Sequence, residues 1–380
     1  ILKANPWLCG ELVKRGKKQV NLEYLSGGEE IKSAGVHFIN GVSAGKKPAV
    51  ASEMNYEDIC NEVANTICEV PPGNKLVGKS KPLITLSVIA DSKRPTDTFV
   101  VILSISHIVV DGFGYYQILE MLNEGSEILK LSPTRKHEIM EQSAEAIGKD
   151  DFNWMTSSAV ICNVVCSMLC GKKAIVRCFE IDGGKVNSEK EKAASSASGG
   201  FVSTNDVIVS SFGNACSTSQ LLMPINFRNK LPLFNDNDAG NYEGSLLFAG
   251  EEEYGSPANV RNVLKSGPPK YFRGADKMGN VPGGPVPLPR GFCGTAKSRL
   301  GMVTNWAFGV FDELKVEGCE QIVHLPHTNC KMIPFDICVV FKAKAGRIAA
   351  AYFVRNVDEK GLKKDCPVGN MMKNAESFVD

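Results

Sequence analysis

The segment Ser106-His107-Ile108-Val109-Val110-Asp111-Gly112 joins two stretches of chain with different apolar patterns. Residues 99–106 before it form an almost continuous apolar run, which is typical of a buried strand. From Tyr115 to Leu122 after it, apolar residues recur at helical spacing. The pattern therefore predicts that His107 lies where a strand gives way to a helix.

The surrounding segments predict a mixed α/β or α+β fold. Residues 83–89 alternate in polarity, and a polar loop separates them from residues 99–106, which indicates an antiparallel hairpin. A second hairpin is predicted for 337–343 and 347–354 around Gly346. Further predicted helices cover residues 56–70, stopped by Pro71 and Pro72, residues 157–170, and residues 207–216 after the capping cluster Ser203-Thr204-Asn205-Asp206.

The length of 380 residues corresponds to two or three domains at roughly 100–200 residues each. Residues 186–200 become charged and then rich in Ser, Ala and Gly, so we expect a linker or crossover there. This divides the chain into an N-terminal half, 1–185, and a C-terminal half, 201–380. The Pro- and Gly-rich residues 267–294 are expected to form a long surface loop.

Composition excludes several classes of protein. Hydrophobic residues make up 43% of the chain and the formal net charge is +1, which disfavours both a disordered chain and a general nucleic-acid binder. The longest apolar runs are shorter than the roughly 20 residues of a spanning helix, so no transmembrane segment is expected. The odd count of 13 cysteines favours a reducing compartment, the cytoplasm or an organelle lumen such as the plastid stroma. Because the chain begins at Ile1, we expect a preceding piece, and a targeting segment is not visible.

His107 is the strongest candidate for chemistry. A histidine at a strand end can act as a general base near neutral pH if a partner fixes its tautomer, and Asp111 is the nearby candidate. The alternative from spacing alone is a core histidine followed by an Asp that caps the helix. An HxxxDG pattern leaves both open.

Four further segments resemble, in order, the superfamily that contains chloramphenicol acetyltransferase, the BAHD acyltransferases and the condensation domains of peptide synthetases. All share the HxxxD motif. The matching segments are Asn5–Leu12, Phe201–Ile208, Asn226–Leu231 with Gly240-Asn241-Tyr242, and Val303–Trp306. The resemblance covers nearly the whole chain apart from the family's first strand, which would precede Ile1.

The resemblance implies a two-domain chloramphenicol acetyltransferase-like fold with a channel between the halves. It also implies transfer of an acyl group from acyl-CoA, a cosubstrate, to a small-molecule alcohol or amine, without a bound cofactor, a metal or a covalent acyl-enzyme. The protein is expected to be a monomer. The implied roles are these: His107 is the base, Asp111 pairs with Arg228, Gly112 permits a tight turn, Asn241 lies in the channel, and Thr304, Asn305 and Trp306 position the acyl carbonyl.

Three departures from the family pattern keep alternatives open. The plant-type DFGWG motif is absent, because residues 311–318 are FDELKVEG, and Asn305 replaces the usual serine. Ser106 replaces the first histidine of the commoner HHxxxD form. A non-catalytic binding or scaffold protein of the same fold is the main alternative, and a condensation-type enzyme acting on carrier-protein thioesters is the other.

Other motifs compete more weakly. Residues 41–45 match the GxSxG pattern of serine hydrolases, but a glycine-rich loop is favoured. Residues 319–330 contain Cys319, His324, His327 and Cys330 at zinc-like spacing, but residues 320–325 are patterned as a strand, which would separate them. Cys162, Cys166 and Cys170 share one helix face and are expected in the core. The basic cluster 360–364 is expected to be a solvated helix face.

Overall fold

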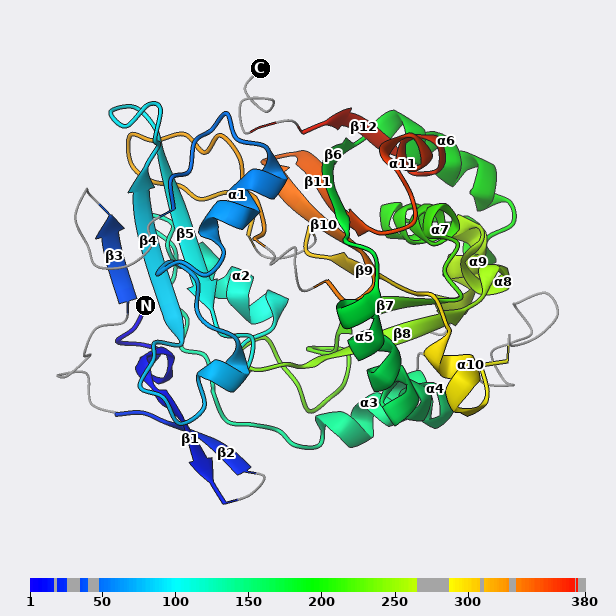
Figure 1. The fold of residues 1–380 in the computed structure, drawn as a ribbon, viewed down its shortest axis with the longest axis horizontal. Helices are drawn as coiled ribbons and strands as arrows, with labels where there is room; N and C mark the ends of the chain where they lie inside the picture. The colour runs from blue at the N-terminus through cyan, green and yellow to red at the C-terminus, as the bar shows by residue number, and fades with distance from the viewer. Residues whose placement is uncertain are drawn as a thin grey trace.

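The structure is a computed structural model that describes residues 1–16, 19–25, 35–39, 48–264, 287–307, 311–327, 333–372 and 374. The GxSxG motif at 41–45 and Cys330 lie outside these residues. Figure 1 shows the fold from the N-terminal strands β1 to β5 on one side to the large sheet on the other. The N-terminal half contains β1 (Glu11–Arg15), β2 (Gln19–Glu23), β3 (Gly35–Ile39), α1 (Tyr56–Val63), β4 (Ile84–Ala90), β5 (Phe99–Ile105), α2 (Gly112–Glu120), α3 (Ile139–Ile147), α4 (Lys149–Met155), α5 (Ser158–Cys170) and β6 (Ile175–Ile181).

The remaining elements follow β6. They are α6 (Gly183–Ala194), α7 (Thr204–Cys216), β7 (Gln220–Asn226), β8 (Glu243–Ala249), α8 (Glu251–Tyr254), α9 (Pro257–Leu264), α10 (Gly291–Ala296), β9 (Leu300–Asn305), β10 (Asp336–Lys344), β11 (Arg347–Val354), α11 (Glu359–Asp365) and β12 (Val368–Met371). The prediction of a mixed α/β fold with mixed sheets is confirmed.

A seven-stranded mixed sheet has the order β12-β6-β11-β10-β9-β7-β8. Strand β9 runs parallel to both β10 and β7, whereas β10 and β11 form the predicted antiparallel hairpin. Successive side chains of a strand point to opposite faces, so Tyr352 of β11 packs with Phe212 of α7, and Phe353 packs with Tyr56 of α1 on the other face. Helices therefore cover both faces of this sheet.

A smaller sheet has the order β3-β4-β5 and carries the predicted hairpin of β4 and β5, with Ile84 opposite Ile105. The apolar residues of this region pack with Trp7, Leu8 and Val110 in a core of their own. This sheet ends directly before the HxxxD segment, so it positions His107.

The expected linker differs from the structure over most of its length. Residues 183–194 form α6, in which the Asp182 side chain accepts a hydrogen bond from the backbone N–H of Lys185. Lys, Glu and Ala favour a helix once such a cap is present. The charged composition of this segment is therefore that of a helix and not of a flexible linker. Strand β6, which falls within residues 1–185, pairs with β11 and β12 of the other half. The division of the chain at 186–200 stays a prediction.

Three other segments differ from their predicted bounds. Helix α1 ends at Val63 and not near Pro71, because Asn65 adopts a left-handed conformation with φ of 60°. Residues 291–294, at the end of the expected long loop, belong to α10, which continues to Ala296. Residues 320–325, expected as a strand, have no regular secondary structure.

One stretch, Lys149–Cys170, is long and apolar enough by length and composition to cross a membrane. It consists of α4 and α5, which meet at Thr156 and Ser157. Most of its apolar stretch lies outside the core. No transmembrane segment was expected, and the described residues contain this one candidate by length and composition.

Candidate active site

His107 lies in the connection between β5 and α2, as its position in the sequence predicts. The connection is held by the backbone N–H of Ser106, which donates to Leu83 O at 2.8 Å, and by the buried side chains of Val109 and Val110. His107 itself is exposed. The alternative of a core histidine is therefore wrong.

His107 forms two contacts with Asn241, which lies just before β8: one through its backbone oxygen and one through its ring. Asn241 Nδ2 donates to the His107 backbone O at 2.9 Å, and this contact fixes the orientation of the amide. Asn241 Oδ1 then faces His107 Nδ1 at 3.0 Å. Because an amide oxygen only accepts, Nδ1 must carry a proton, which leaves the lone pair of the neutral ring on Nε2. The residue that sets the tautomer is therefore Asn241 and not Asp111.

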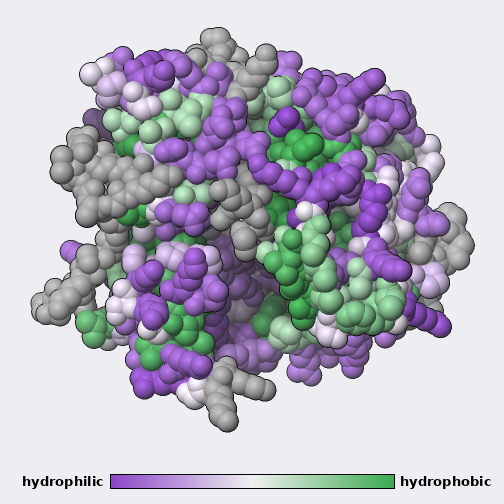
Figure 2. All heavy atoms as spheres, in the orientation of Figure 1, coloured by the Kyte–Doolittle hydropathy of each residue, from purple (hydrophilic) through white to green (hydrophobic). Residues whose placement is uncertain are grey.

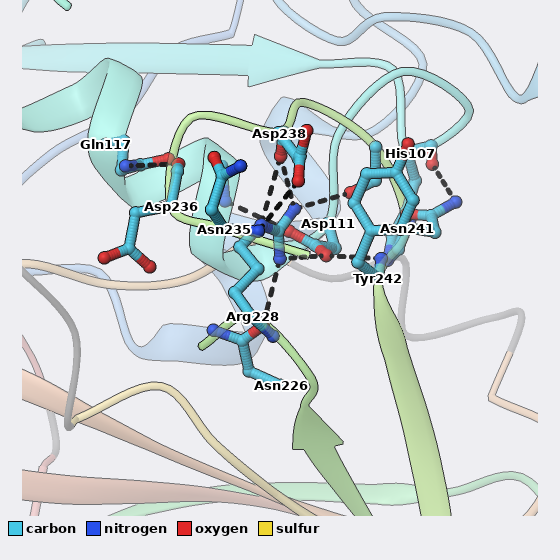
Figure 3. Close-up of polar contacts among 12 residues, drawn as sticks. His107, Asp111, Gln117, Asn226, Arg228, Asn235, Asp236, Asp238, Asn241 and Tyr242 are labelled. Carbon is cyan, nitrogen blue, oxygen red and sulfur yellow. Dashed lines mark hydrogen bonds and ion pairs between the residues drawn. The ribbon is translucent and has the colours of Figure 1, made fainter. Parts of the chain in front are cut away.

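Asp111 is buried, with 2% of its surface exposed, and caps α2. Its Oδ1 accepts from the backbone N–H of Gly114 at 3.0 Å. Its Oδ2 accepts from Arg228 Nη1 at 2.8 Å and from the backbone N–H of Tyr242 at 3.0 Å. The carboxylate thus joins the start of α2 to the start of β8, and Figure 3 draws its interactions with Arg228 and Tyr242 and none with the His107 ring.

Arg228 has every donating nitrogen engaged with a buried acceptor. Besides Asp111, the guanidinium donates to the backbone oxygens of Asp238 and Gly240 and to Asn226 Oδ1, at 2.8–3.1 Å. Gly240 adopts φ of 150°, and an added Cβ would lie 2.8 Å from the Tyr242 ring, so the segment requires glycine here. Arg228 therefore fixes the loop that presents Asn241 to His107.

Gly112 does not serve the tight turn that the family resemblance implies. It is the first residue of α2, its φ is not positive, and an added Cβ would meet the Trp306 indole nitrogen at an ordinary 3.6 Å. The same contact shows that Trp306 lies beside the start of α2. Trp306 Nε1 donates to Thr304 Oγ1 at 2.9 Å, which leaves the hydroxyl hydrogen of Thr304 available for another acceptor.

Asn305 is engaged elsewhere. Its Nδ2 donates to Asn205 Oδ1 at 2.9 Å, and its Oδ1 accepts from the backbone N–H of Ala307 at 3.0 Å. The side chain thereby connects the end of β9 to the first turn of α7. Of Thr304, Asn305 and Trp306, Thr304 retains a hydroxyl hydrogen for another acceptor, while the amide of Asn305 is used within the fold.

Glu243 is an acidic group at this site that the sequence reasoning missed. It is the first residue of β8, two positions after Asn241. Its side chain reaches solvent, yet desolvation by surrounding atoms raises the pKa of its carboxyl, and the nearby Asp111 carboxylate raises it further. His107 and Arg228 act in the opposite direction. The sequence offered no signal for it beyond its distance of two residues from Asn241.

The residues with zinc-like spacing make other contacts. The His324 ring nitrogen Nδ1 lies 2.9 Å from the backbone O of Lys342, and His327 Nε2 lies 3.1 Å from that of Cys60. Burial lowers the pKa of the His324 ring. Cys319 is exposed. Within the described ranges, no group of three or more His, Cys, Asp or Glu side chains could hold a metal ion.

Two further expectations have opposite outcomes. The basic cluster 360–364 lies on α11, where Lys363 pairs with Glu359 at 2.7 Å, as expected of a solvated helix face. The core assignment of the α5 cysteines is wrong. Cys162 is half-buried, and Cys166 and Cys170 are exposed.

Comparison with known proteins finds a similar fold in solved structures and no match by sequence. No protein-family model and no curated protein matches the sequence. TRI101 of F. graminearum, complexed with coenzyme A and deoxynivalenol, superposes with a TM-score of 0.55 at 16% identity, over 96% of this chain and 87% of that one. TRI101 of F. sporotrichioides, complexed with coenzyme A and T-2, gives 0.53 at 13% identity over 96% and 86%. Polyketide synthase associated protein 5 from Mycobacterium tuberculosis gives 0.51 at 13% over 95% and 86%.

Proposed function

We propose, from the premise that this chain has the chloramphenicol acetyltransferase-like fold, that it is an acyl-CoA-dependent acyltransferase with His107 as its general base. The acceptor would be a small-molecule alcohol or amine. The observation that carries the proposal is the pair of contacts between His107 and Asn241, because in the neutral imidazole it keeps the proton on Nδ1 and leaves the lone pair on Nε2. The coenzyme A in the TRI101 complexes supports the choice of donor.

The proposed reaction needs one proton to leave the acceptor and one to reach the thiol. Nε2 of His107 takes the proton from the acceptor hydroxyl or amine as its O or N attacks the thioester carbonyl carbon. The C–S bond of the tetrahedral intermediate then breaks, and the imidazolium returns the proton to the departing thiolate. In the intermediate, the Thr304 hydroxyl supplies a donor for the oxyanion, because its oxygen already accepts the Trp306 N–H.

Under this proposal Asn241 is a positioning residue and Asp111 a structural one. Asn241 acts through the orientation of the imidazole, whereas Asp111 and Arg228 hold the loops that carry His107 and Asn241. We also propose that the protein is a monomer and that it works in a reducing compartment. The free thiols on α5 support the second point.

The test is thiol release from acyl-CoAs of increasing chain length with pooled alcohols and amines, together with product identification by mass spectrometry. We expect His107→Ala to lower the rate about 10²- to 10⁴-fold, the usual contribution of a positioned base. The exposed His137 supplies the matched control, and His137→Ala should act as wild type. Asn241→Asp should move the acidic limb of the kcat/KM profile to higher pH, because a carboxylate at Nδ1 stabilises the imidazolium.

Equal thiol release by wild type and His107→Ala would contradict the proposed base. Absence of any ester or amide, with equal acyl-CoA binding by both proteins, would favour a non-catalytic binding protein. That alternative draws on the engagement of Asn305 within the fold.

A further inference from the structure

Helix α5 presents an apolar face to solvent. Its 13 residues include no Asp, Glu, Lys or Arg. Ile161, Val165 and Leu169 are 58%, 46% and 78% exposed and recur every fourth residue, so they share one side of the helix. Figure 2 shows hydrophobic side chains gathered over α5 beside a hollow with hydrophilic walls. We call Ile161, Val165, Met168 and Leu169 the α5 face.

The opposite side of α5 is anchored, so the α5 face cannot roll inward. Asn163 Nδ2 lies within hydrogen-bond distance of the backbone oxygens of Thr295, Ala296 and Ser298, at 2.8–3.1 Å. Arg355 Nη1 donates to Ser167 O at 2.7 Å. Turning the helix would break these contacts and leave buried polar groups unpaired, which is unfavourable.

Two thiols lie close together beside the α5 face. Cys162 Sγ and Cys166 Sγ lie 3.8 Å apart. The hydrogen bond between them and the mutual repulsion of thiolates raise the pKa of Cys166. The raised pKa favours the neutral thiol of Cys166, and α5 carries no Asp, Glu, Lys or Arg side chain.

Positive charge begins where the helix ends. Lys172 and Lys173 follow Cys170 after a single glycine; both are exposed, and Lys173 Nζ lies 3.8 Å from Glu57 Oε1 in a loose surface pair. The neighbouring helix α10 exposes Phe292, at 56%, and is followed by the exposed Lys297. An apolar stripe bordered by ammonium groups complements a layer of anionic headgroups above acyl chains.

The dimensions of α5 favour a lipid surface over a protein partner. A 13-residue helix is about 20 Å long, and one side of it about 10 Å wide, so it offers about 200 Å². Stable protein interfaces bury about 800 Å² on each partner. A spanning helix needs about 20 apolar residues, whereas α4 before it carries Asp150 and Asp151, so α5 suits a position flat in the interface.

We propose that α5 docks this protein on anionic membranes, with the α5 face in the boundary between headgroups and acyl chains and with Lys172 and Lys173 on the headgroups. This proposal does not depend on the proposed acyl transfer, because membrane binding can be measured without any enzymatic turnover.

The first experiment is flotation of the full chain with vesicles of phosphatidylcholine alone or mixed with phosphatidylserine. We expect wild type to float with the mixed vesicles, and Val165→Glu/Leu169→Glu to weaken this binding at least about tenfold, because two carboxylates would enter the interface. The matched control is Leu25→Glu, which adds a charge at another exposed leucine, 66% accessible, and should float as wild type. Circular dichroism checks that each variant is folded.

The second arm tests charge. Lys172→Glu/Lys173→Glu should weaken binding to the mixed vesicles about tenfold or more and make the residual binding insensitive to salt. Lys79→Glu/Lys81→Glu makes the same charge change at two other exposed lysines and should leave binding unchanged. The proposal is overturned if wild type floats with neither kind of vesicle. It is also overturned if Lys172→Glu/Lys173→Glu and Lys79→Glu/Lys81→Glu bind the mixed vesicles equally. It is also overturned if wild type is a dimer that Leu169→Glu dissociates, since a second copy would then cover the α5 face.

Discussion

Removal of the Asp111 carboxylate should destabilise the fold more than it alters the chemistry. In Asp111→Ala, the backbone N–H groups of Gly114 and Tyr242 lose their acceptor, and Arg228 loses its counter-ion. Breaking a buried pair by removing one partner costs about 3–5 kcal/mol. Arg228 retains its contacts with Asn226, Asp238 and Gly240, so we expect the lower part of that range, about 3 kcal/mol.

The assay is urea denaturation followed by circular dichroism, arranged as a double-mutant cycle. Asp111→Ala, Arg228→Met and the double variant give the coupling free energy, and we expect the double variant to be less destabilised than the sum of the single variants by about 1–3 kcal/mol. Because the hydrogen bonds of Asp111 go to Arg228, Gly114 and Tyr242 and not to the His107 ring, activity per folded molecule should be largely retained. Near-wild-type stability of Asp111→Ala combined with lost turnover would refute the structural role and return Asp111 to the chemistry.

Two further predictions concern other parts of the fold. Asp91 accepts from the backbone N–H groups of Ser52, Lys93 and Arg94; although burial of Asp91 acts to raise its pKa, these contacts lower it below 3.8. The contribution of Asp91 to stability is therefore present above pH 3.8 and is lost as pH falls through the lower folded pKa. Asp91→Asn should reduce the urea midpoint at pH 7, and the midpoint of this variant should fall less steeply in acid than that of wild type. An equally steep fall in both proteins would contradict this. Gly112→Ala should leave the thermal midpoint unchanged or slightly raised, because the added Cβ meets only an ordinary contact. Gly213→Ala should lower the free energy of unfolding by about 1–3 kcal/mol, since its Cβ would lie 2.4 Å from the Tyr254 ring. Equal thermal midpoints for the two variants would refute the packing argument.

The local elements follow from the order of residues along the chain. The switch from the apolar run at 99–106 to helical spacing placed His107 between β5 and α2, and the Ser203 to Asp206 cluster marked the start of α7 as a capping box. Strand and helix periodicity arise from contacts between near neighbours, so they can be predicted without knowing the fold.

Local composition misled where distant partners decide burial. The charged residues at 188–192 suggested a linker, but a capped helix forms there. The cysteines of α5 suggested a core, but the anchoring of Asn163 by residues 295–298 turns them outward. A periodic pattern identifies a helix face without saying what, if anything, covers it.

The sequence by itself determined the helices and strands around the HxxxD motif and, through its family resemblance, the fold. Only the tertiary structure decided what stands next to His107. Asn241 and Glu243 are more than 130 residues away along the chain, and the Asp111–Arg228 pair brings them there. The tautomer of a histidine depends on the atom beside its Nδ1, and that atom belongs to a loop whose position is set by packing across the whole chain.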